Sequence, residues 1–193
     1  MLRSTLRVNS KNKKPHGNER YMIYMVEMDF RNTEREHDWH TWYIGHVTTL
    51  ITKVPGFRAT QRFRGLTPMP APWMAIHDVV SPDIFESKEY KAVGGPASTG
   101  EWQHQHTNWT RNAYAGIDNT PDVPLDAHLL VADAGAKLPA PLSANVTWLE
   151  NVGLDRTTGG RGIAIVPPGK LTANLFHTPN VRVYKPITPR VGE

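Results

Sequence analysis

The chain has 193 residues, 39% of them hydrophobic, with six tryptophans and no cysteine. This length allows one domain, or two small domains that share a core, and the absence of cysteine excludes disulfides, thiolate metal sites and cysteine nucleophiles. The formal net charge is +4, but residues 1–20 alone carry +5, so the remaining residues sum to −1. This near-neutral body has no basic stripe, which argues against a nucleic-acid partner.

No apolar run approaches the ~18 residues of a membrane helix, and the first twenty residues lack the apolar core of a secretory signal. We therefore expect no membrane partner and a cytoplasmic location. Residues 1–19 form a polar, basic arm, which we expect either to be solvated or to clasp a partner.

The first predicted strand runs from Tyr21 to Phe30, where β-forming residues dominate and apolar residues are nearly continuous until Glu27 and Asp29. These two acids share one face of the strand, because successive side chains alternate between faces.

A long amphipathic helix is predicted within residues 38–57, and it is the most informative segment of the chain. At about 100° per residue, its apolar arc spans roughly 200°, which indicates a helix covered on more than one side. Residues 33–36 fit a capping box at its start, and Pro55-Gly56 ends it. His40 and His46 lie inside the arc, so we expect a small-molecule site under this helix. The aromatic members of the arc are Trp39, Trp42 and Tyr43.

The remaining predicted helices and strands of the first half follow in the order of a ferredoxin-like unit. They are a strand at 57–64, a proline-rich turn at 65–72, a strand at 73–80, a helix from Ser81 to about Ala92, a polar stretch at 97–110 and a short strand near 111–117. Ser81 caps the second helix and Pro82 takes its first position. Strand, helix, strand, strand, helix, strand is the ferredoxin-like split βαβ arrangement.

The second half repeats this order in a degenerate form after a linker at 118–125. We predict a strand at 127–133, a helix at 141–154, a strand at 162–166, a short helix or strand at 171–177 and a strand at 181–187. The domain organisation is therefore an arm at 1–19, an α/β half at 20–117 and a second half at 126–193 packed on the first.

Three motifs of the first half resemble the EthD-like branch of the dimeric α/β-barrel superfamily. They are the run from Trp39 to His46, the turn Val54-Pro-Gly-Phe57, and Arg62-Phe63 on the next strand. The resemblance covers about residues 20–117. It implies an α+β fold in which ferredoxin-like units form a dimeric barrel, or a pseudo-dimeric barrel built from the two halves. Members include isomerases, cyclases, small monooxygenases, haem-binding proteins and proteins without known activity. The basic arm, the polar insert at 94–110 and the second half depart from the family pattern.

His46 is the first candidate for catalysis. An imidazole titrates near neutrality and can act as acid or base, and burial would favour its neutral base form. The alternative is a core histidine bonded to a backbone carbonyl. Tyr43, Glu27 and Asp29 are candidates for the second proton-transferring group, since paired acids in a barrel interior can differ in pKa.

The predicted substrate-binding residues are mostly aromatic or basic: Tyr24, Trp39, Trp42, Arg62 and His77. Arg62 shares a strand face with Arg58 and Arg64 and could bind a carboxylate, although three such charges are more often solvated or ion-paired. His104 and His106 have the alternate spacing of a metal-binding pair but lack a third ligand nearby, so we predict no metal.

Together these features predict a cofactor-independent lyase or isomerase that acts by acid–base proton transfer on an aromatic or unsaturated, oxygenated small molecule. We expect a homodimer or higher homo-oligomer. Two alternatives stay open: a monooxygenase on the same scaffold, either haem-binding or cofactor-free, and a non-catalytic assembly protein in which the arm is the working part.

Overall fold

The computed structural model describes residues 22–193, except for the side chains of residues 96 and 97. The predicted basic arm lies outside the described residues. Within them, no helix is both long and apolar enough to span a membrane.

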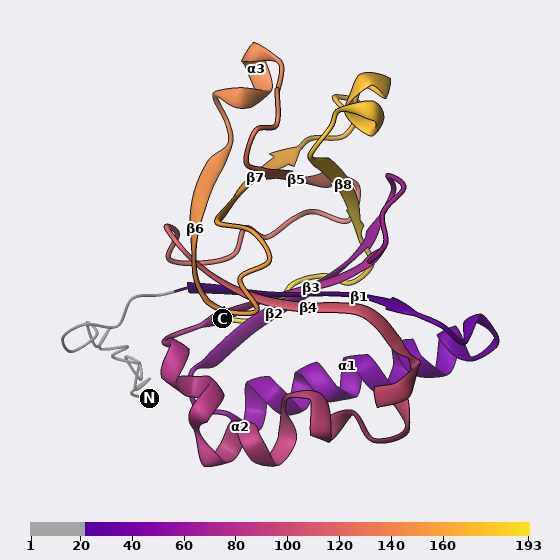
Figure 1. Ribbon diagram of the computed structural model, residues 1–193, viewed down its shortest axis with the longest axis vertical. Helices are drawn as coiled ribbons and strands as arrows, with labels where there is room; N and C mark the ends of the chain where they lie inside the picture. Colours follow the sequence, from indigo (N-terminus) through magenta and orange to yellow (C-terminus); the bar gives the residue numbers. More distant parts are fainter. Residues whose placement is uncertain (1–21) are drawn as a thin grey trace, which may run out of the picture.

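Eight strands close into an antiparallel barrel (Figure 1). They are β1 (Met22–Phe30), β2 (Phe57–Gly65), β3 (Trp73–Val79), β4 (His106–Ala115), β5 (His128–Asp133), β6 (Thr147–Leu154), β7 (Gly160–Val166) and β8 (Val181–Pro186). The strand order is β3-β1-β4-β6-β7-β5-β8-β2, and pairing of β2 with β3 closes the circle. A short β9 (Val191–Gly192) adds to the start of β2. The predicted α+β barrel is thus confirmed as an eight-stranded antiparallel barrel.

The same strand order occurs twice in the barrel. The first four strands are arranged β4-β1-β3-β2, and the last four are arranged β8-β5-β7-β6. The two sets meet along β4–β6 and β8–β2, where Tyr114 faces Asn151 and Arg64 faces Lys185 in the two registers. A single chain therefore closes the barrel without a second copy.

One outer face of the barrel is covered by helices, which lie below the sheet in Figure 1. They are η1 (Thr33–Arg35), α1 (Glu36–Lys53), η2 (Pro82–Glu86), α2 (Lys88–Val93) and η3 (Pro96–Gln105). The buried residues of α1 are Trp39, Tyr43, Val47 and Leu50, a helical stripe narrower than the predicted arc. Ile44 is 49% exposed, so α1 is covered on one side only.

The predicted caps were partly wrong. No capping-box bond forms at Thr33, and a 3-10 turn precedes α1 instead. The predicted second helix is split in two, because Ser81 and Ser87 each accept a bond from a backbone N–H, that of Asp83 at 3.2 Å and that of Tyr90 at 3.1 Å. Each serine therefore starts a short helix of its own.

The predicted helix at 141–154 was wrong. Only one turn, α3 (Ala140–Ser143), is helical, and β6 follows it. Leu149 and Asn151 are buried whereas Trp148 and Glu150 are exposed, which is the period of a strand. The segment at 171–177 contains the 3-10 helix η4 (Ala173–His177). The second half thus has only α3 and η4 where the first half has five helical segments.

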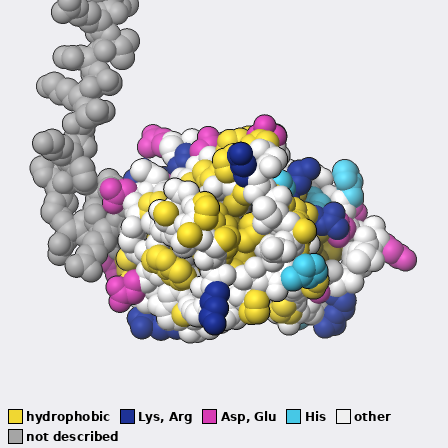
Figure 2. Space-filling view, turned by 90° about the horizontal axis from the view of Figure 1, so that it is seen from above, with side chains coloured by type: hydrophobic (Ala, Val, Ile, Leu, Met, Phe, Trp, Pro, Cys, Tyr) yellow, Lys and Arg dark blue, Asp and Glu magenta, His cyan; other side chains and the backbone are white. Residues whose placement is uncertain are grey.

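The outer face of the second half is correspondingly less covered. A hollow of about 960 Å³ lies between α3 and η4, lined by residues such as Leu142, Val166 and Leu175. Figure 2, which views the molecule from this side, shows apolar side chains gathered in the middle of the face.

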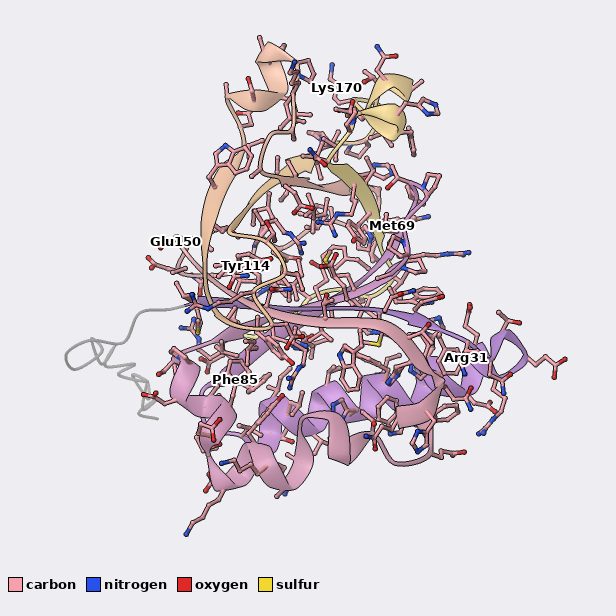
Figure 3. All side chains as sticks on the ribbon, viewed as in Figure 1. Arg31, Met69, Phe85, Tyr114, Glu150 and Lys170 are labelled. Atoms are coloured by element: carbon pink, nitrogen blue, oxygen red, sulfur yellow. The ribbon has the colours of Figure 1, made fainter. Side chains whose placement is uncertain are left out.

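Two apolar cores lie on opposite sides of the first four strands. Phe85 belongs to the core between sheet and helices, whereas Tyr114 and Met69 belong to the core inside the barrel (Figure 3). Alternate side chains of β1 contribute to the two cores. Tyr24, Val26 and Met28 face the helices, whereas Ile23 and Met25 face the barrel interior.

Candidate active site

A small aromatic cavity lies between α1 and the sheet. Its volume is about 30 Å³, and it is lined by side chains from β1, α1, β3, α2 and β4. The polar and aromatic members of its lining are Tyr24, Trp42, Tyr43, His46, His77, Tyr90, Thr99, His106 and Trp109. Of the predicted site residues, the structure brings together Tyr24, Trp42, Tyr43, His46 and His77.

Three histidines line this cavity, and all are neutral at pH 7. Burial lowers the pKa of His46 to about 4, that of His77 to about 3 and that of His106 to about 4. His46 stacks on Trp42 with ring centroids 5.0 Å apart, and His77 stacks on Tyr24 at 5.3 Å. We call His46, His77 and His106 the cavity histidines.

Hydrogen bonding fixes the tautomer of His106. The Trp39 Nε1–H donates to its Nε2 at 2.9 Å, so the proton of the neutral ring must reside on Nδ1. Trp39 itself is fully buried, stacks on Phe30 and does not line the cavity. The structure therefore does not bring Trp39 to the cavity, because its indole N–H donates to His106.

Three buried nitrogens of the cavity lining have no hydrogen-bond partner among the described residues. They are His77 Nδ1, His106 Nδ1 and Trp109 Nε1. Leaving a buried polar group unpaired is costly, so three on one cavity indicate that this cavity is built to receive a polar molecule.

Tyr43 and Arg62 meet at the edge of this site. The Arg62 guanidinium carbon lies 4.1 Å from the centre of the Tyr43 ring, and Arg62 Nη2 lies 3.0 Å from His40 Nδ1. Burial raises the pKa of Tyr43 to about 12 and lowers that of Arg62 to about 10. Arg62 pairs with no carboxylate among residues 22–193, but it does not line the cavity.

Glu27 lies on the face of β1 turned away from the cavity, so the structure does not bring it together with His46. It is inside the barrel, where it accepts bonds from Arg161 at 2.6 Å, Arg182 at 2.5 Å and the Tyr184 hydroxyl at 2.9 Å. Asp133 bonds to the same two arginines at 3.0 and 2.7 Å and so closes a ring of four charges. Burial alone would raise the pKa of Glu27, but the two guanidiniums hold it below its ordinary value.

The other predicted polar residues also lie away from the cavity. Asp29 accepts a bond from the backbone N–H of Phe30. The predicted arginine face is divided, because Arg62 is buried whereas Arg64 is exposed. His104 is exposed, and no group of three histidine or acidic residues in the described part of the chain could hold a metal.

His106 and Trp109 were missed as site residues because the fourth strand was predicted to begin near residue 111. It begins at His106, which places both side chains under α1. Only the cluster of aromatic residues and histidines between 102 and 109 hinted at this role.

Comparisons with known proteins add information on the fold. No family model matches the chain, and no curated protein matches it. Among solved structures, the chain is similar to that of an anthrone oxidase-like protein, with a TM-score of 0.51 and 8% identity over 90% of this chain and 93% of that one. At this identity the likeness concerns the barrel fold alone.

Proposed function

We propose that this protein is a cofactor-independent enzyme of the lyase or isomerase type, which moves protons on an aromatic or unsaturated, oxygenated small molecule. The observation that carries the proposal is the set of three neutral imidazoles around one aromatic cavity. Neutral imidazole accepts protons, and the aromatic side chains around His46 suit a flat substrate.

His46 is the proposed general base, since it is half-buried and borders the cavity in its neutral form. Tyr43 is the proposed acid, because a phenol with a pKa raised to about 12 keeps its proton at pH 7. Trp42 would contact the substrate, whereas the predicted contacts Tyr24 and His77 would line the cavity behind His46. Arg62 does not line the cavity, so it would not bind a substrate carboxylate directly. Its guanidinium lies over the Tyr43 ring and would stabilise the negative charge left on Tyr43 after proton donation.

We further propose that each half is a degenerate ferredoxin-like unit of the EthD-like kind, so that one chain equals a dimeric barrel. The repeated strand order supports this. A homodimer stays a prediction, although it is not needed to close the barrel.

Hydrogen–deuterium exchange tests the proton transfer before the full reaction is known. The protein is incubated in D₂O with a panel of keto- and hydroxyaromatic compounds, and NMR follows exchange at carbon. We expect His46→Ala to slow the catalysed exchange by about 10²–10⁴-fold. His177→Ala, an exposed histidine on η4, is the control. Wild-type exchange in His46→Ala would exclude this role.

A cofactor-free monooxygenase is the second candidate, favoured by the fold likeness to an anthrone oxidase-like protein. Oxygen consumption with the same panel distinguishes it, because a lyase or isomerase consumes none. A haem does not fit the residues present, since a cavity of about 30 Å³ beneath His46 and His77 is far too small for a porphyrin.

A further inference from the structure

The stacked pair of Trp42 and His46 separates two hollows. On its inner side lies the cavity of about 30 Å³ described above. On its outer side lies an open groove of about 920 Å³, with α1 on one side and residues of α2 and η3 on the other. Trp42 and His46 line this groove as well as the cavity. His46 is the only one of the cavity histidines that borders both hollows.

The inner cavity has the size and the polar groups for one water molecule. A water needs roughly 10–15 Å³ of accessible space and two to four polar partners, and it commonly makes about three hydrogen bonds. His106 Nδ1–H and Trp109 Nε1–H are two donors without a partner among the described residues, and His77 Nδ1 is a third unpaired atom. One water accepting from the first two and donating to His77 would satisfy all three. A ring-bearing substrate would not fit beside it.

The outer groove has room for such a ring. Gly45 lines the groove in the middle of α1, and a Cβ added there would meet no atom within 4 Å. Glycine within a helix lowers stability by about 1 kcal/mol relative to alanine. Because alanine would fit at position 45 without a clash, packing within the protein does not explain the glycine there. Close approach of a ligand to the helix surface supplies one. Trp42 offers the adjoining aromatic surface.

We propose that the site works as two compartments: a flat hydroxyaromatic or unsaturated substrate docks in the groove over Gly45, and a single water occupies the inner cavity. His46 lies between them and takes a proton from the substrate carbon on the groove side, while His77 and His106 hold the water on the inner side. The proton leaves carbon for His46 and returns to another atom of the substrate, so the step is redox-neutral. This inference rests on the proposed function for the role of His46, whereas the two binding sites do not depend on it.

Binding in the groove is tested by NMR on the full, ¹⁵N-labelled chain, with 2-naphthol as the probe. We expect the Gly45 amide and the Trp42 indole signals to shift on titration, while the amide of Gly169, which lies in the second half, stays unchanged. Gly45→Leu fills the groove and should weaken binding at least tenfold. Thr48→Leu places the same side chain at an exposed position of α1 that does not line the groove and should bind as the wild type.

The spectra of the variants also report whether they fold. Unchanged 2-naphthol binding in a folded Gly45→Leu variant, or equal weakening in Thr48→Leu, would overturn the docking site.

The water is tested by a high-resolution crystal structure of the full chain. We expect one solvent peak within about 3.2 Å of His77 Nδ1, His106 Nδ1 and Trp109 Nε1. A cavity without that peak would overturn the inner compartment. His46→Ala tests the role of His46 through its exchange rate alone, because His46 also borders the groove. Wild-type exchange in this variant would sink the proposed function, whereas the docking site stands or falls with Gly45→Leu.

Discussion

The ring of charges inside the barrel predicts a large loss of stability when Glu27 is replaced by glutamine. Glu27 is 3% exposed and accepts three hydrogen bonds, two of them from arginines. Glutamine keeps the shape but offers one acceptor oxygen instead of two, and its amide N–H₂ would point at a guanidinium donor. Breaking a buried ion pair from one side costs about 3–5 kcal/mol. Because Asp133 still pairs with both arginines, we expect about 3 kcal/mol.

Urea unfolding at pH 7 measures this loss, with Glu150→Gln as the control because Glu150 is exposed on β6. For a chain of this size, about 3 kcal/mol corresponds to a fall in Tm of roughly 6–12 °C. A change below about 1 kcal/mol in Glu27→Gln would refute the reasoning that this ring joins β1 to the second half.

The pH dependence of the same variant adds an independent check. The folded-state pKa of Glu27 is lowered, so its contribution to stability is complete above the unfolded pKa of about 4.3 and is lost as the pH falls through the folded value. The difference in stability between wild type and Glu27→Gln should therefore be constant from pH 5 to 7 and shrink below about pH 4.

Three further predictions concern the layer under α1. The cavity histidines have lowered pKa values, so the stability they contribute is full above about pH 6.5 and decreases as the pH falls towards 4, and their ring-proton NMR signals should not titrate between pH 6 and 8. Trp39→Phe removes the donor to His106 Nε2 and should cost about 3 kcal/mol in chemical unfolding, from the unpaired nitrogen and the smaller ring. Asn108 has a φ of 48°, and its side chain donates to the Pro70 carbonyl, a bond that both Asn108→Val and Asn108→Gly remove. Asn108→Val should therefore be less stable than Asn108→Gly by about 1–2 kcal/mol, and equal stabilities would contradict a strained backbone there.

Most strands of the first half and the end of its long helix could be predicted, because their patterns are unambiguous. The alternation in β2 and the Pro55-Gly56 stop after α1 each favour one structure. In β6, by contrast, Leu149 and Val152 are spaced as on a helix, while Leu149 and Asn151 alternate as on a strand. The barrel decides between them, because β6 must pair with both β4 and β7 to close it. Such long-range pairing is invisible in the local pattern.

Local sequence could not predict which face of the sheet the Glu27 side chain would point to. Both faces of β1 are buried, so hydrophobic alternation does not tell which face meets the helices and which meets the barrel interior. Its partners Arg161 and Arg182, and the Asp133 that shares them, come from the second half of the chain, more than one hundred residues away. The sequence analysis expected this acid in the barrel interior, where it lies, but grouped it with His46, which lies on the other side of the sheet.

The odd spacing of His106 and Trp109 shows how a local irregularity builds the site. Residues three apart on a regular strand face opposite ways, yet both of these line the same cavity. The register of β4 against β1 slips here: Thr107 pairs with Asp29 and Thr110 with Glu27, so two residues of β4 oppose one of β1. The positive φ of Asn108 lies within this bulge. Bulges re-aim side chains, and this one turns Trp109 to the face of His106. The unpaired N–H groups of His106 and Trp109 therefore line one cavity because β4 contains one extra residue at this bulge. A strict two-residue alternation along the sequence does not predict such a bulge.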